Sequence, residues 1–291
     1  MGGRRMRPEV ALLDALDSPG GVQYPLCGGL ARWLLLLGAV VGVAAVAIPV
    51  MRPVVDRDPT VQSVVQYADG PRRVHILKRR LRGATFDETQ ESFAVVRGDP
   101  RLREWGRAHS RQSQIDRDSE EAAELGGIIA ALVRASDSAV RNATDHVLGN
   151  VIGRNLGGGA ASPSQYTNVV HRDLDEAACA NFGAKHGLRS FYNAWVPLGA
   201  VVQDPLALLL PSSRGGESQG HAVGFHSSLE HDRTGLRHHS RHQWVYFDGL
   251  QPGDALLWHS QAVYHASFTL PSMGSGGTQP RRSVDIRIMF P

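Results

Sequence analysis

Short apolar runs, separated by glycine, proline and charged residues, dominate the second half of the chain. Runs of this length that are bounded by turn residues predict the strands of a sandwich or barrel. We expect such strands over residues 190–196, 205–210, 243–247, 255–259, 262–268 and 283–290.

An apolar pattern with helical spacing precedes these strands, within residues 116–146. Its apolar members recur on one helix face, and glutamates gather on its N-terminal side, where they favour a helix start. The apolar members are Ile128, Ile129, Leu132 and Val133. A shorter helix is expected over residues 174–186. The predicted fold class is therefore mainly β with flanking helices.

The longest apolar segment covers residues 33–51, contains no charged residue, and is flanked by Arg32 and Arg52. A helix of this length would span about 28 Å, close to the hydrocarbon thickness of a bilayer. The pattern predicts a single transmembrane helix, with a cleaved signal peptide as the alternative. We therefore expect a single-pass membrane protein, and a glycosylation sequon at Asn142 is compatible with a luminal catalytic domain.

Composition changes along the chain suggest its domain organisation. Residues 1–32, rich in glycine, proline and arginine, predict a flexible tail ahead of the membrane anchor. Residues 52–73 are polar, contain prolines and predict a linker, so one domain is expected over residues 74–291. Residues 212–242 are rich in glycine, serine and histidine and predict an insertion loop. A lid over a site and adventitious metal binding are the alternatives for this loop.

Charge and cysteine content narrow the possible partners. The formal net charge is only +3, and basic residues are scattered among acidic ones, so we expect no nucleic-acid partner. The two cysteines, Cys27 and Cys179, lie far apart, which excludes a disulfide framework and a cysteine zinc site.

The candidate chemistry begins at His171 and Asp173, which end a short β-branched run. Strand periodicity places both side chains on one face, where they could bind one metal ion. Alternatively, Asp173 could cap the helix that follows. A second histidine would complete the 2-His-1-carboxylate set of Fe(II) oxygenases. His265 is the expected third ligand, and His259 is the alternative metal ligand.

The C-terminal third of the chain also offers residues for a co-substrate site. Iron held by three such ligands keeps positions for a bidentate 2-oxo acid and for O2. The far carboxylate of that acid requires a bidentate cation and a hydroxyl, which Arg281 and Ser283 supply from one strand face. Arg287 is the alternative clamp, and Asn193 could hold the co-substrate carboxylate near the iron.

The order of these motifs resembles the non-haem Fe(II)/2-oxoglutarate-dependent hydroxylase/desaturase family that includes a cephamycin 7-hydroxylase component and AsaB-like proteins. The matching stretches are residues 145–148, 170–173, 193–198, 204–208, 244–247, 265–268 and 281–287. Residues 253–259 are also similar to phytanoyl-CoA-hydroxylase-like dioxygenases. The resemblance implies a double-stranded β-helix, which is a jelly-roll or cupin-like fold, with Fe(II), 2-oxoglutarate and O2. It also implies His171, Asp173 and His265 as iron ligands, and Arg281 with Ser283 as the co-substrate clamp.

The leading functional hypothesis is therefore an oxidoreductase, a dioxygenase that hydroxylates or desaturates a small molecule such as a secondary metabolite or a lipid-like compound. One alternative is a membrane-anchored, non-catalytic cupin-like binding protein. Another is a metal-dependent hydrolase that uses the histidines of residues 212–242.

Overall fold

The computed structural model describes residues 59–79, 85–86, 91–109, 115–154, 169–201, 204–214, 223–226, 232–270 and 281–291. The chain divides into two compact units, Met1–Arg57 and Asp58–Pro291. Every described residue belongs to the second unit, which therefore contains all the helices and strands named below.

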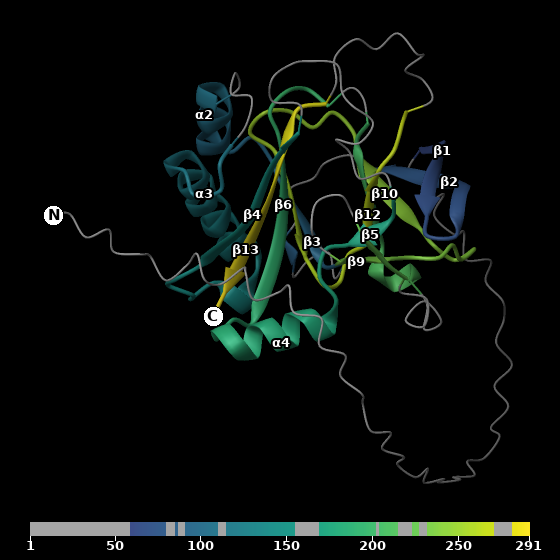
Figure 1. The fold of residues 1–291 in the computed structure, drawn as a ribbon. Coiled ribbons are helices and arrows are strands. Elements are labelled where there is room, and N and C mark those ends of the chain that lie inside the picture. Colours follow the sequence, from purple (N-terminus) through teal and green to yellow (C-terminus); the bar gives the residue numbers. More distant parts are fainter. Residues whose placement is uncertain are drawn as a thin grey trace, which may run out of the picture. The chain divides into compact units, whose positions relative to one another are not determined.

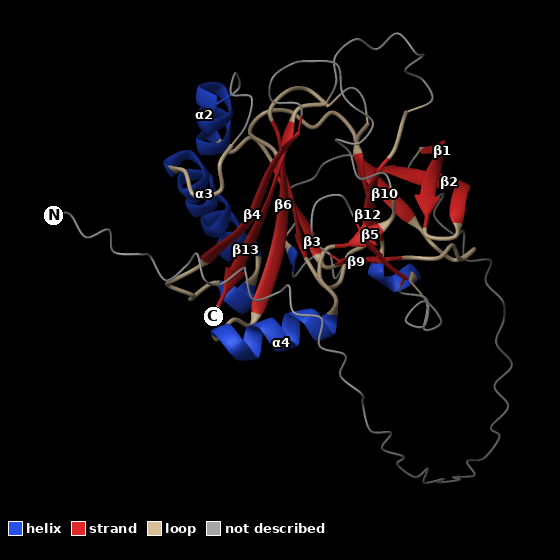
Figure 2. Cartoon of the chain, in the orientation of Figure 1, coloured by secondary structure: helices blue, strands red, loops and turns tan. Residues whose placement is uncertain are grey.

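The second unit is built mainly from strands, with helices at its margins (Figure 2). The helices are α2 (Pro100–His109), α3 (Glu120–Ser136) and α4 (Glu176–His186), with the short 3-10 helices η3 (Ser138–Val140) and η5 (Pro211–Ser213). The strands are β1 (Thr60–Tyr67), β2 (Gly70–Arg79), β3 (Phe93–Val96), β4 (Val147–Arg154), β5 (His171–Arg172), β6 (Ser190–Pro197), β7 (Leu206–Leu209), β8 (Val223–His226), β9 (Asp232–Gly235), β10 (Trp244–Phe247), β11 (Ala255–His259), β12 (His265–Ser267) and β13 (Ser283–Phe290).

Two sheets form the framework (Figure 1). The larger has the strand order β1-β2-β10-β7-β12-β5-β9-β8, and the smaller has the order β3-β11-β6-β13-β4. A buried cluster contains residues of both, such as Trp195 and Trp258 from the smaller sheet with Leu208 and Val245 from the larger. The two sheets therefore share an apolar core, as expected for a mainly β, jelly-roll-like fold.

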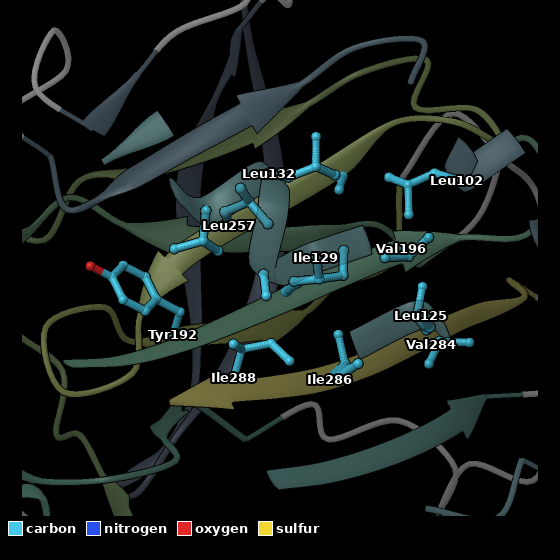
Figure 3. Packing of buried hydrophobic residues seen from close by; sticks show 14 of the residues in the cluster. Leu102, Leu125, Ile129, Leu132, Tyr192, Val196, Leu257, Val284, Ile286 and Ile288 are labelled. Atoms are coloured by element: carbon cyan, nitrogen blue, oxygen red, sulfur yellow. The ribbon is translucent and has the colours of Figure 1, made fainter. Parts of the chain in front are cut away.

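The other face of the smaller sheet is covered by helices, with α2 and α3 lying along β4 and β13 (Figure 1). Figure 3 shows Leu125, Ile129 and Leu132 of α3 packed with Val196 of β6 and Ile286 of β13. Because both faces of β6 are covered, the strand is buried from Phe191 to Pro197 and does not alternate between buried and exposed residues.

The helix ends follow from their capping residues. Ser119 accepts a hydrogen bond from the Ala122 amide and caps α3, as the acidic residues after it suggest. The helix α2 begins at Pro100, directly after Asp99. Asp99 accepts hydrogen bonds from the Leu102 amide and from the Arg101 amide, and Pro100 is compatible with the first helical turn.

The expected linker over residues 52–73 is corrected from Pro59 onward, because the described part forms β1 and the start of β2. Val65 and Tyr67 of β1 are buried while Val64 before them is exposed, which is the alternation of a half-buried strand. The carbonyl of Gln66 also accepts a hydrogen bond from the Val170 amide at 2.7 Å. This first strand therefore supports the chain just before His171.

The expected insertion loop over residues 212–242 is also corrected in part. Two of its segments are strands, β8 and β9, which pair with each other and extend the larger sheet. In that sheet Gly235 of β9 lies opposite His171 of β5. This part of the insertion is therefore joined to the sheet beside the candidate site, because its backbone completes the hydrogen-bond ladder of β5.

The prediction of a single-pass membrane protein with a luminal domain is wrong, and the described helices are the reason. In the described ranges no helix combines the length and the apolar character needed to cross a bilayer. The longest, α3, has 17 residues and carries several charged side chains. The expected anchor over residues 33–51 itself lies outside the described residues.

Candidate metal centre

Strand pairing in the larger sheet brings two histidines together. His171 of β5 lies opposite His265 of β12 in antiparallel register. Both side chains are buried, and their ring centroids are 4.3 Å apart. Neighbouring strands, β9 beside β5 and β7 beside β12, hold these two short strands in the sheet. The two imidazoles therefore share one face because the register requires it.

Asp173 completes a three-residue cluster. Its Oδ1 lies 3.6 Å from His171 Nε2, and its Oδ2 lies 3.7 Å from His265 Nε2. One ligand atom from each of the three residues lies within 4.8 Å of the other two. Among the described residues, this is the one group of histidines and carboxylates with such spacing. The arrangement of donors suits a single metal ion bound on one face.

The backbone determines which nitrogen His171 can offer to a metal. Its Nδ1 lies 2.8 Å from the carbonyl oxygen of Val169. A carbonyl oxygen only accepts, so Nδ1 must carry the proton and donate it. In the neutral ring Nε2 then keeps its lone pair, and this is the nitrogen that faces Asp173.

Asp173 does not cap the following helix. That role belongs to Asp175, whose carboxylate accepts a hydrogen bond from the Ala178 amide at 2.6 Å at the start of α4. Gly187 ends the same helix at φ +68°, a conformation that glycine adopts without strain. The Asp173 side chain can therefore face the two histidines.

Asn193 lies at the Asp173 carboxylate. Its amide nitrogen donates a short hydrogen bond to Asp173 Oδ2, and its amide oxygen accepts one from the Ser260 hydroxyl at 2.7 Å. Both polar atoms of the amide are thus engaged by the protein. We expected Asn193 to hold the co-substrate carboxylate. In the structure it contacts Asp173, one of the candidate metal ligands.

Arg287, the alternative clamp, also lies beside the cluster. Its Nη2 is 3.7 Å from Asp173 Oδ2, and its Nε donates to the Asn193 amide oxygen at 3.3 Å. The Arg287 side chain is 13% exposed, so little water contacts its guanidinium. Arg287 therefore places a positive charge next to the Asp173 carboxylate.

Ser283 is the first residue of β13 and Arg281 lies two residues before it, and both are buried. The Arg281 guanidinium carbon lies 5.2 Å from the ring centroid of Trp195, and its Nη1 donates a short hydrogen bond to the carbonyl of Asp204. Asp204 leads into β7, whose Leu208 pairs with His265. These contacts place the guanidinium beside Trp195 of β6 and the segment that leads into β7.

His259, the alternative metal ligand, lies elsewhere. Its Nε2 is 3.1 Å from Asp137 Oδ2, and the Tyr192 hydroxyl donates to the same carboxylate oxygen at 2.9 Å. Tyr192 belongs to the cluster under α3, on the opposite face of the smaller sheet. Burial lowers the pKa of His259, and the Asp137 carboxylate opposes that effect. His259 is therefore part of a buried polar group apart from the cluster.

Two further residues, Ser260 and Trp258, lie beside the cluster, and neither has a role that we expected from the sequence. Ser260 fixes the Asn193 amide, and Trp258 lies with its ring centroid 4.9 Å from that of His265. No sequence signal identifies Ser260, because its partner comes from a different strand. Trp258 could be suspected from its place in an apolar strand that ends near the histidines.

Cys179 is the one cysteine among the described residues, and it is buried and forms no disulfide there. Burial raises the pKa of its thiol to about 11, and the nearby Arg287 acts in the opposite direction. A thiol with such a pKa is protonated at neutral pH and is a poor nucleophile or metal ligand. The candidate chemistry therefore rests on nitrogen and oxygen donors.

Comparison with known proteins gives matches over most of the chain. A family model described as "YDMC: Oxidoreductase/YMDC permease-like domain" matches residues 49–290. A curated relative from Talaromyces stipitatus, the alpha-ketoglutarate-dependent dioxygenase tstK, is 28% identical over 140 residues. That alignment covers 44% of this chain and 49% of the relative, so the chain spans about half the length of this curated relative.

Solved structures provide matches in fold. The iron and alpha-ketoglutarate-dependent endoperoxidase NvfI superposes with a TM-score of 0.59 at 17% identity, covering 80% of this chain and 97% of that one. The same enzyme in a different conformation gives a TM-score of 0.58 at 18% identity, over 79% of this chain and 95% of that one. At these identities the likeness shows a shared fold.

Proposed function

The chain belongs to the oxidoreductase/YMDC permease-like domain family, and from that premise we propose that it is an Fe(II)- and 2-oxoglutarate-dependent dioxygenase. The observation that carries the proposal is the buried cluster of His171, Asp173 and His265, whose ligand atoms lie within 4.8 Å of one another. The relative tstK, an alpha-ketoglutarate-dependent dioxygenase by name, supports the same reaction class.

The donor set fits iron. His171 offers Nε2 because its Nδ1 is engaged by the Val169 carbonyl. His265 and Asp173 add a second imidazole and a carboxylate, which gives the nitrogen and oxygen set of non-haem Fe(II) oxygenases. Three protein ligands on one side leave positions for a co-substrate and O2. These three residues would hold the metal.

The start of β13 fits the far carboxylate of 2-oxoglutarate. Arg281 presents a buried guanidinium, which recognises a carboxylate with two parallel hydrogen bonds. The Ser283 hydroxyl is fully buried and has no hydrogen-bond partner within the described ranges. A buried hydroxyl left in this state costs about 1–3 kcal/mol, which a ligand carboxylate would offset. Arg281 and Ser283 would therefore hold the co-substrate.

With Fe(II), 2-oxoglutarate and O2 bound, the centre supplies oxidising chemistry in which the co-substrate loses CO2 and becomes succinate while a substrate C–H bond is oxidised. The chain's own residues bind and orient these partners. His171 and His265 are held in place by the sheet register. Trp258, which is 2% exposed, packs beside His265 and excludes water from that side.

The substrate we propose is a small molecule that becomes hydroxylated or desaturated. The motif order that resembles the cephamycin 7-hydroxylase and AsaB-like group supports a secondary metabolite or lipid-like compound. The carboxylate at Asp173 supports oxygenation over halogenation, because a halogenase needs that metal position for halide. The proposed catalytic unit is the one within residues 58–291, which contains every residue of the site.

The proposal can be tested by co-substrate turnover in the absence of a known substrate. The purified chain is incubated aerobically with Fe(II), ascorbate and 2-oxoglutarate, and succinate is measured by mass spectrometry. We expect slow, iron-dependent succinate formation that is lost in His265→Ala and retained in Asn142→Ala, an exposed asparagine. Equal succinate formation in His265→Ala, or none in the wild-type chain, would favour a non-catalytic binding protein instead.

A further inference from the structure

The Asp173 carboxylate is held by the opposite sheet. Asp173 lies in a bend between β5 and α4, outside the hydrogen-bond ladder that fixes His171 and His265. Asn193 of β6 reaches it from the smaller sheet and donates to its Oδ2. A side chain in such a bend needs an external partner to keep one orientation, because the local backbone does not supply it.

Two donors determine the direction of the Asn193 amide. The Ser260 hydroxyl donates to its Oδ1 at 2.7 Å, and Arg287 Nε donates to the same atom at 3.3 Å. Both Ser260 and Asn193 are buried, at 0% and 6% exposed. An amide whose oxygen accepts from two donors must present its NH2 group on the other side. That side is the Asp173 carboxylate.

Arg287 and Asn193 act from paired positions. They lie opposite each other in the register of β13 and β6, so both side chains leave the same sheet face at the same level. The guanidinium stands 3.7 Å from Asp173 Oδ2, the oxygen that also accepts from Asn193. One oxygen of the carboxylate is therefore bound to the smaller sheet.

Resting on the iron site proposed above, we propose that Asn193 is a positioning residue that fixes the Asp173 carboxylate in its metal-binding orientation, with Ser260 setting the direction of its amide. Outer partners that orient a metal ligand in this way typically change metal affinity by about 10- to 100-fold when removed. Asn193 itself contacts neither the metal nor the substrate; it acts through Asp173.

The test is anaerobic titration of the full chain with Co(II), followed by the visible absorption of the bound ion. Asn193→Leu preserves side-chain size while removing the donor, and we expect it to weaken Co(II) binding by about 10- to 100-fold. Ser260→Ala removes one donor that orients the amide, and we expect a loss of about fivefold. Asn142→Leu, at an exposed position, is the matched control and should bind like the wild-type chain.

Thermal unfolding of each metal-free variant separates positioning from packing. If Asn193→Leu unfolds near the wild-type temperature and binds Co(II) as tightly as the wild-type chain, the positioning role is overturned. If that variant does not fold, Ser260→Ala decides, and unchanged affinity there overturns the role. A wild-type chain that takes up no Co(II) overturns the metal centre itself and the positioning role with it, whereas wild-type binding with unaffected variants overturns the positioning role alone.

Discussion

His265 of β12 lies directly opposite His171 of β5, with the two imidazole ring centroids 4.3 Å apart. The two strands contribute two and three residues to the sheet, so neither has much pairing of its own. The site exists only when the sheet has closed around them. Metal binding and folding of this sheet are therefore coupled.

Metal should consequently stabilise the folded chain. With Co(II) at about 100 times its dissociation constant, we expect the free energy of unfolding to rise by about 2.7 kcal/mol. Urea unfolding with and without Co(II) measures this rise. Asp173→Ala should remove most of it, because one ligand is lost. An identical midpoint with and without metal in the wild-type chain would contradict the coupling.

Arg281 and Ser283 should control co-substrate affinity. Arg281→Lys keeps the charge but loses the planar fork, and we expect the KM for 2-oxoglutarate to rise by about 10- to 100-fold. Ser283→Ala should raise it by about fivefold, since one neutral hydroxyl is removed. Succinate formation at varied 2-oxoglutarate measures both changes. The clamp assignment would be wrong if both KM values stayed at the wild-type level.

His259 should matter for stability and not for metal binding. Replacing it with alanine leaves the buried Asp137 carboxylate with one fewer partner, which should cost about 1–3 kcal/mol of unfolding free energy. Tyr192→Phe, which removes the other partner of that oxygen, should cost a similar amount. Urea unfolding and Co(II) titration of the same samples separate the two properties. Weaker Co(II) binding by folded His259→Ala would restore it as a ligand candidate.

Stability should fall at mildly acidic pH because of His242. Burial lowers its pKa to about 4, and His238 and His239 act in the same direction. Its ring is also stacked on Tyr67, with centroids 5.6 Å apart. The unfolded chain, where the pKa is about 6.5, then binds the proton more readily than the folded chain.

The contribution of His242 is therefore fully present above about pH 6.5 and is lost as the pH falls to about 4. Urea unfolding at pH 7.5 and pH 5 should show a drop that is smaller in His242→Gln. Carboxylates contribute to the drop in both proteins, so the comparison isolates the histidine. A drop of equal size in both would contradict the assignment.

Local patterns are enough to predict much of the fold. The strand expected over residues 255–259 is β11 with the same bounds, because an apolar run after a glycine turn has few alternatives. His171 and Asp173 lie together as the sequence suggests, but strand periodicity is not the reason, because β5 ends at Arg172 and Asp173 lies in the bend that follows. The strands in residues 60–79 are less visible, because their polar residues and Pro71 also suit a linker.

The other parts of the fold and of the site depend on contacts between segments that are distant in sequence. The choice between His259 and His265 depends on which sheet each strand joins, because β11 belongs to the smaller sheet while β12 pairs with β5 in the larger one. The contact of Asn193 with Asp173 crosses from one sheet to the other, so its sequence position gives no sign of it. Strands β8 and β9 form because β5 offers an unpaired edge, which local composition does not reveal.

The central claim is that His171, Asp173 and His265 form an iron centre that binds 2-oxoglutarate. One measurement tests this claim directly. Fe(II) is added to the purified chain under argon, 2-oxoglutarate is added next, and the visible absorption spectrum is recorded. We predict a weak charge-transfer band that requires both additions, is absent in His171→Ala and is unchanged in Asn142→Ala. A wild-type spectrum without the band, or an undiminished band in His171→Ala, would contradict the claim.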